Sequence, residues 1–160
     1  LRMLYTCRRG REFEKGGNEL LAMLRRINAE FPDTTELIAP ENMPFSNFVR
    51  MLASVDIVSD QIYSYTPGTT ALMAMAMGAV PLSGGENEFY RFIGEPCDAV
   101  RPIFNPDPRD LENTYSRLRS LVMYPDELRR MSAAGPGFVA RHNEASVVAD
   151  RYIAFWDKAV

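Results

Sequence analysis

Residues 60–85 read DQIYSYTPGTTALMAMAMGAVPLSGG, and this stretch decides the fold. Its polar turn leads into a segment, starting at Thr69, that is apolar on every side. A helix without a polar face must be covered all round, so we expect it inside the domain and its methionines in the core. Gly78 ends this helix, and residues 79–82 follow as a strand.

The same alternation of strands and helices extends in both directions from this stretch. Further strands are expected at residues 2–7, 35–39, 55–59 and 100–104. Helices are expected at about 18–30, from a cap at Ser46, over 111–122, at 125–131 and at about 137–158. Short strands that alternate with longer helices are typical of a parallel sheet with helices on both faces. The sequence therefore predicts an α/β fold, a Rossmann-like parallel sheet flanked by helices.

Composition favours one ordinary globular domain. The chain has 160 residues, of which 46% are hydrophobic and 24% are charged. A net charge of −3 argues against nucleic acid or an anionic membrane as a partner, because both require a basic face. The chain contains no apolar run long enough to span a membrane, no leader peptide and too few cysteines for a disulfide framework. We expect a cytoplasmic protein without an integral membrane segment.

The turn before the buried helix is a candidate anion site. Gly68 has no side chain that would keep an anion from the backbone, and Thr69 and Thr70 follow in the first helical turn. N–H groups there are unpaired and lie at the positive end of the helix dipole. A plain turn capped by Thr69 explains the same residues without a ligand, so spacing alone leaves both interpretations open.

The loop after the first expected strand carries two cations. Arg11 can donate two hydrogen bonds to a phosphate, and Lys15 adds a point charge. A solvated charged turn is the alternative for this loop. In an open parallel sheet, ligands bind beyond the carboxyl ends of the strands, and both candidate loops are expected at that edge. Together they predict a diphosphate site made by Arg11, Lys15, Gly68, Thr69 and Thr70.

Other polar residues are expected at the same edge. Glu86 and Asn87 follow a strand and could meet the hydroxyl groups of a sugar or a ribose, although they also fit an ordinary polar turn. Tyr65 could stack on a ring or simply pack. The single histidine, His142, is expected on the surface, which disfavours Ser-His-Asp catalysis and multi-histidine metal sites.

Residues 60–90, DQIYSYTPGTTALMAMAMGAVPLSGGENEFY, resemble the C-terminal domain of GT-B glycosyltransferases of the large retaining family 4 (group 1), in particular bacterial members with DQ, YTP and AMA-G in this order. The R-x-x-x-K-G run at residues 11–16 and the closing YIAFW agree with this. The resemblance covers essentially the whole chain. It implies that residues 1–160 form one nucleotide-sugar-binding domain, half of a GT-B fold. The N-terminal acceptor domain is then absent from this chain, which agrees with a start at Leu1 rather than methionine.

The resemblance also implies roles for single residues. Family members use an Arg and a Lys after the first strand, and backbone amides before the buried helix, to hold the donor diphosphate. These positions are the five residues already predicted from the loops. Two glutamates that contact the donor sugar and the ribose in the family fall on Tyr65 and Met73 here. Methionine cannot accept hydrogen bonds from a ribose as a carboxylate does, so Glu86 and Asn87 are the candidate substitutes.

Glycosyl transfer from a nucleotide-diphosphate sugar, with retention, is the function that the resemblance implies. The base is expected near residues 40–45, and no catalytic residue is assigned within the chain. No cofactor or obligate metal is expected, because cationic side chains and helix amides can stabilise the departing diphosphate. An acceptor glycan or lipid-linked glycan would bind through the missing domain, which could also hold the protein at the inner membrane, and this chain alone is expected to be inactive. The alternative is a non-catalytic scaffold or interaction module that has lost donor binding.

Overall fold

The computed structural model describes residues 1–6, 10 and 12–159. Within them, four parallel strands form one sheet in the order β2-β1-β3-β4. The strands are β1 (Arg2–Leu4), β2 (Glu36–Ile38), β3 (Ile57–Ser59) and β4 (Val80–Leu82). The strand expected at residues 100–104 is reduced to one parallel bridge between Phe104 and Leu82. The sheet confirms the predicted α/β class with parallel strands.

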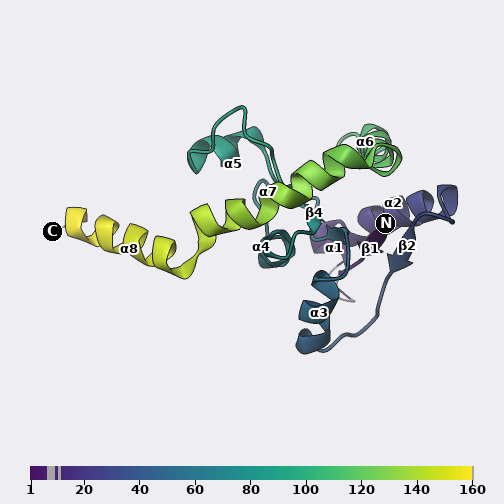
Figure 1. Cartoon of the computed structure of the whole chain (residues 1–160), viewed down its shortest axis with the longest axis horizontal. Coiled ribbons are helices and arrows are strands. Elements are labelled where there is room, and N and C mark those ends of the chain that lie inside the picture. The colour runs from purple at the N-terminus through teal and green to yellow at the C-terminus, as the bar shows by residue number, and fades with distance from the viewer. Residues whose placement is uncertain (7–9, 11, 160) are drawn as a thin grey trace.

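Helices cover both faces of the sheet (Figure 1). They are α1 (Glu12–Lys15), α2 (Gly17–Glu30), α3 (Phe45–Leu52), α4 (Thr69–Ala76), α5 (Asn87–Phe92), α6 (Leu111–Met123), α7 (Pro125–Asn143) and α8 (Ala145–Ala159). Alternate strand residues point to opposite faces, so Met3 and Ile57 pack with residues of α2, α6 and α7. Leu4 and Val58 enter a second core with residues of α3 and α4.

Helix α4 is the predicted buried helix, and it lies between the sheet and α7. Ala71, Ala74 and Met75 have no exposed surface. Gly135 of α7 approaches the backbone of α4 so closely that an added Cβ would lie 2.7 Å from the Met75 carbonyl oxygen. Met77, however, is 40% exposed, so the prediction that α4 is covered on every side is wrong for one edge.

The C-terminal helices differ from the predicted ones. Helix α7 is continuous over Pro125–Asn143, whereas the sequence predicted a helix ending at Met131 and another beginning at Gly137. Pro136 lies inside α7 and does not end it. Gly135, the residue before it, packs closely on the backbone of α4, a contact between residues far apart in sequence. The break occurs instead at Glu144, where the backbone is extended.

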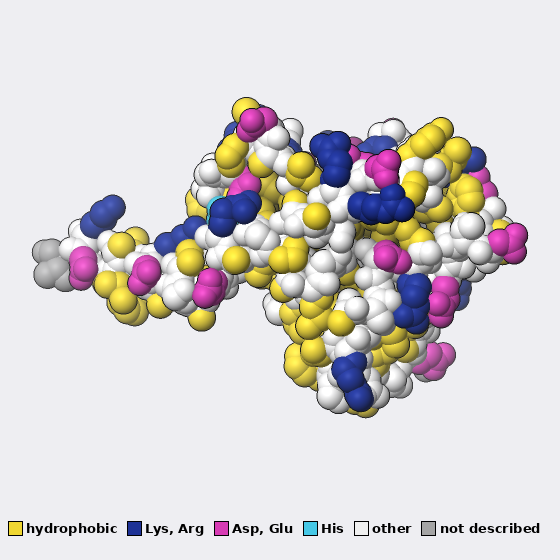
Figure 2. Space-filling model, viewed as in Figure 1, with side chains coloured by type: hydrophobic (Ala, Val, Ile, Leu, Met, Phe, Trp, Pro, Cys, Tyr) yellow, Lys and Arg dark blue, Asp and Glu magenta, His cyan; other side chains and the backbone are white. Residues whose placement is uncertain are grey.

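Helix α8 projects away from the sheet, with the C-terminus at its far end (Figure 1). Hydrophobic side chains lie along it in Figure 2, and Tyr152, Ile153, Phe155 and Trp156 are each 52% to 68% exposed. Among the described residues, no helix combines the length and the apolar character needed to cross a membrane.

Candidate functional site

The strand order places a switch point between β1 and β3. From β1 the chain adds β2 on one side and β3 on the other, and such a reversal opens a crevice at the carboxyl ends of the strands. Thr6 follows β1 and is tied to the end of β3. Its N–H donates to Ser59 Oγ at 3.0 Å and its hydroxyl donates to the Ser59 carbonyl oxygen at 2.5 Å.

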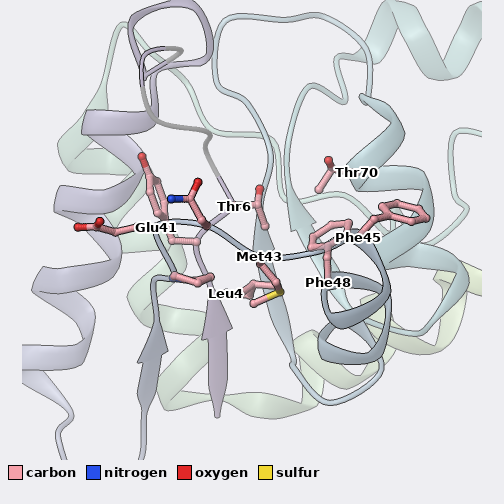
Figure 3. A pocket seen from close by; sticks show the side chains of 10 residues that line it. Leu4, Thr6, Glu41, Met43, Phe45, Phe48 and Thr70 are labelled. Carbon is pink, nitrogen blue, oxygen red and sulfur yellow. The ribbon is translucent and has the colours of Figure 1, made fainter.

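A cleft of about 360 Å³ opens at this edge of the sheet. Its walls come from the end of β1, the loop of residues 40–43, α3 and the first turn of α4. In Figure 3, Thr6 and Thr70 lie above the apolar side chains of Leu4, Met43 and Phe48. The cleft therefore offers hydroxyl groups on one side and an apolar surface on the other. The segment predicted to lie near a nucleobase, residues 40–45, lines it.

Asp60 connects the two predicted anion-binding loops. Its side chain is fully buried, and its Oδ1 lies 3.1 Å from Lys15 Nζ. Its Oδ2 accepts hydrogen bonds from the Gly68 N–H at 3.0 Å and from the Ser83 hydroxyl at 2.9 Å. A buried carboxylate requires such partners, because an unpaired one would be strongly destabilising. Lys15 and Gly68, both predicted to bind a diphosphate, thus bind the chain's own carboxylate here.

Gly16 fixes the turn between α1, which ends at Lys15, and α2. It has φ of 66°, a conformation that favours glycine, and it precedes α2. A Cβ at this position would lie 1.9 Å from Cγ2 of Ile62. The Ile62 N–H also donates to the Lys15 carbonyl oxygen at 2.9 Å. The loops after β1 and β3 are therefore locked together beside Asp60.

The N-terminus of α4 retains the donors that the sequence predicted. Gly68 is the residue that precedes the helix, and its N–H is the one bound by Asp60. Among the described residues, the backbone N–H groups of Thr69 and Thr70 have no acceptor. Thr70 lines the cleft, whereas the side chain of Thr69 is exposed. An anion in the cleft can therefore meet the first turn of α4 at Thr70.

Tyr65 and Glu86 come together, but in a different cavity. The Glu86 N–H donates to the Tyr65 carbonyl oxygen at 3.3 Å, and both residues line a hollow of about 430 Å³. Arg109 also lines this hollow, where its hydrogen bonds to Asp107 hold the pKa of that carboxyl below its ordinary value. Asn87 lies nearby, and its side-chain oxygen accepts a hydrogen bond from Arg101. The predicted sugar-binding residues thus do not share the cleft of Thr70.

Met73, at the second position where the family has a glutamate, is half-buried against the core cluster that contains Leu4 and Val58. A carboxylate there would therefore face apolar side chains.

His142 is not the surface residue that the sequence predicted. Its side chain is 11% exposed, and Nε2 lies 2.6 Å from Oε1 of Glu95, which is itself buried. Burial raises the pKa of Glu95, but hydrogen bonds from His142 and Arg141 outweigh it and hold that pKa below its ordinary value. Because this cluster connects α7 to the chain after α5, we interpret it as a structural contact.

The structure leaves two predictions about the site untested, one for Arg11 and one for a metal ion. Arg11, expected to bind the diphosphate beside Lys15, is not among the residues that the structure describes. Within the described ranges, no group of three or more histidine, cysteine, aspartate or glutamate side chains is arranged to hold a metal ion. The expectation that no obligate metal is needed stays a prediction.

Sequence reasoning missed Asp60 as the centre of the site. A signal was present, because Asp60 is a charged residue directly after the apolar strand β3, at the ligand-binding edge of a parallel sheet. Thr6 and Phe48 were also missed, and nothing in their local sequence distinguishes them from ordinary loop and helix residues.

Replacing Ser83 with alanine tests the network around Asp60. The Ser83 hydroxyl is buried and donates to a buried carboxylate, so its loss is expected to lower the free energy of unfolding by about 2 kcal/mol. Ser132→Ala is the matched control, because that hydroxyl donates to the neutral carbonyl oxygen of Gly78 and is expected to cost about 1 kcal/mol or less. Urea denaturation measures both. Equal losses would show that Asp60 does not depend on Ser83.

Comparison with protein-family models and with curated proteins finds no match for this chain. The resemblance to GT-B transferases therefore rests on the motifs in the sequence.

Proposed function

We propose that this chain binds a nucleotide-diphosphate sugar and forms the donor-binding domain of a retaining glycosyltransferase. The observation that supports the proposal is the cleft at the switch point, where the first turn of α4 meets an apolar wall. Met43 and Phe48 suit a flat nucleobase, and Thr70 at a helix N-terminus suits a phosphate. A nucleoside diphosphate combines these two chemical groups in one ligand.

The proposed chemistry needs positive charge at the departing diphosphate. Charge develops on that group in the transition state, and preorganised donors in a cleft stabilise it there. Lys15 and the backbone N–H groups of Thr69 and Thr70 would supply these donors within the described chain, and Arg11 would add a guanidinium. This set requires no metal ion.

The sugar would extend from the diphosphate toward Tyr65, Glu86 and Asn87, with Arg109 as a further polar contact in the cavity that Tyr65 and Glu86 line. A separate domain would bring the acceptor, a glycan or a lipid-linked glycan, and the remaining catalytic groups. We therefore expect no transfer by this chain alone, and binding is the property to test.

Thermal unfolding in the presence of UDP-, GDP- and ADP-sugars tests the proposal. A ligand present at one hundred times its Kd stabilises a protein by about 2.7 kcal/mol, which raises Tm by several degrees for a chain of this length. We expect one nucleotide class to do so, and the matching nucleoside without phosphates to have little effect. If no nucleotide raises Tm, in this chain or joined to its acceptor domain, the proposal is wrong.

The scaffold alternative is supported by a specific observation. Lys15 and the Gly68 N–H are engaged by Asp60, and Met73 replaces a carboxylate that the family would use for ribose. A domain that had lost its donor would keep such internal contacts and gain a binding surface elsewhere, for which the exposed apolar face of α8 is suited. This alternative predicts no stabilisation by any nucleotide.

A further inference from the structure

Asp60 brings a negative charge to the turn before α4, beside the cleft where the proposed donor's diphosphate would bind. We infer that Asp60 is a built-in competing anion that limits the affinity of this cleft for a diphosphate. The inference rests on the proposed function, and it concerns how strongly the site binds and which anions it accepts. Asp60 then determines affinity through its charge.

The geometry shows that the carboxylate is a fixed part of the fold. Its side chain has no exposed surface, and Gly68 and Ser83 hold Oδ2 from two different loops. A Cβ on residue 68 would lie 2.7 Å from Oδ2, so the glycine there makes room for this carboxylate. The absence of a side chain at Gly68, which was predicted to make room for a bound anion, therefore makes room for the Asp60 carboxylate.

Lys15 is the more exposed partner of the pair. The Lys15 side chain is 29% exposed, and its Nζ lies 3.1 Å from Asp60 Oδ1. An ammonium group has three N–H donors, so this contact uses only one of them. The long flexible stem of lysine can turn the same ammonium toward the cleft. We therefore expect Lys15 to pass from Asp60 to a bound diphosphate, while Asp60 stays with Gly68 and Ser83.

Charge gives the direction of the effect. The Lys15–Asp60 pair carries no net charge, so an incoming anion meets a neutralised lysine and, within a few ångströms, a fixed carboxylate. Repulsion from this carboxylate grows with the charge of the anion, so pyrophosphate is penalised more than orthophosphate. Asp60 thus lowers affinity for all anions and narrows the preference for pyrophosphate over orthophosphate.

Titration calorimetry with inorganic pyrophosphate tests this role without any assumption about the base or sugar. Asp60→Asn keeps an oxygen that can accept from Ser83 or Gly68 but removes the charge, and we expect its Kd for pyrophosphate to fall about tenfold. The preference for pyrophosphate over orthophosphate should rise as well. Asp56→Asn is the matched control, because it removes the same charge just before β3, at the amino-terminal ends of the strands and away from the cleft. It should change Kd less than about twofold.

The possible outcomes separate this inference from the proposed function. Wild-type protein that binds pyrophosphate while Asp60→Asn binds it equally or more weakly would overturn the role of Asp60 and leave the donor site standing. No pyrophosphate binding by wild type or Asp60→Asn, together with no nucleotide effect on Tm, would overturn both.

A measurement on the wild-type protein covers the case in which Asp60→Asn does not fold. Carbon-13 NMR of the Asp60 carboxyl group during pyrophosphate titration should report the departure of Lys15 as a shifted signal. The amide signal of Gly68 should move much less, because that hydrogen bond is kept. Pyrophosphate binding with an unmoved Asp60 signal would contradict the exchange.

Discussion

Replacing Gly16 with alanine is expected to lower the free energy of unfolding by about 3 kcal/mol and Tm by roughly 10 °C. Two costs add. A non-glycine residue at φ of 66° is disfavoured by about 1–2 kcal/mol. The new methyl group would also lie 1.9 Å from Cγ2 of Ile62, so the loop after β3 must move, at a cost of about 1–3 kcal/mol. Urea and thermal denaturation measure the loss.

Gly94→Ala separates the two costs. Gly94 has φ of 76°, but a Cβ there meets no atom within 4 Å, so only the backbone cost of about 1–2 kcal/mol applies. The difference between the variants is then the cost of the clash with Ile62. Equal losses in the two variants would mean that the two loops are not locked together at Gly16, and that Lys15 is less firmly placed than the contact implies.

The sequence was sufficient to predict the layers of the fold. Alternation of short strands and helices predicts a parallel sheet covered on both faces. The two faces are seen directly in β1, where the neighbouring residues Met3 and Leu4 are buried in different core clusters. The sequence was not sufficient for helix α7. Proline predicts an end to a helix, yet Pro136 lies inside α7. Beside it, Gly135 packs on the Met75 backbone, a contact between residues far apart in sequence that no local signal announces.

The candidate site was predicted in part. Lys15, Gly68 and Thr70 were chosen because cations, a glycine and a helix start have local signatures, and the structure brings all three to one edge of the sheet. Asp60 was missed because its three donors come from separate loops, and only the folded chain brings them together. Tyr65 and Glu86 were placed at the correct edge, but the sequence does not show that they line another cavity.

Replacing Thr70 with glutamate is expected to weaken binding of the stabilising nucleotide about 100-fold, with no fall in Tm of the free protein. The two effects differ in sign because of where Thr70 lies. It is in the first turn of α4, where a negative side chain stabilises a helix by about 0.3–1 kcal/mol, and it also lines the cleft. The same carboxylate would repel a diphosphate at the N-terminus and compete with it for the N–H groups of Thr69 and Thr70.

Thr70→Gln provides the control, because glutamine has nearly the size of glutamate but no charge. If the diphosphate lies at α4, Thr70→Gln should weaken binding less than about tenfold, and the additional loss in Thr70→Glu should shrink as salt is raised. Equal losses in both variants would indicate that size rather than charge blocks the cleft. Unchanged affinity in Thr70→Glu would place the diphosphate away from α4.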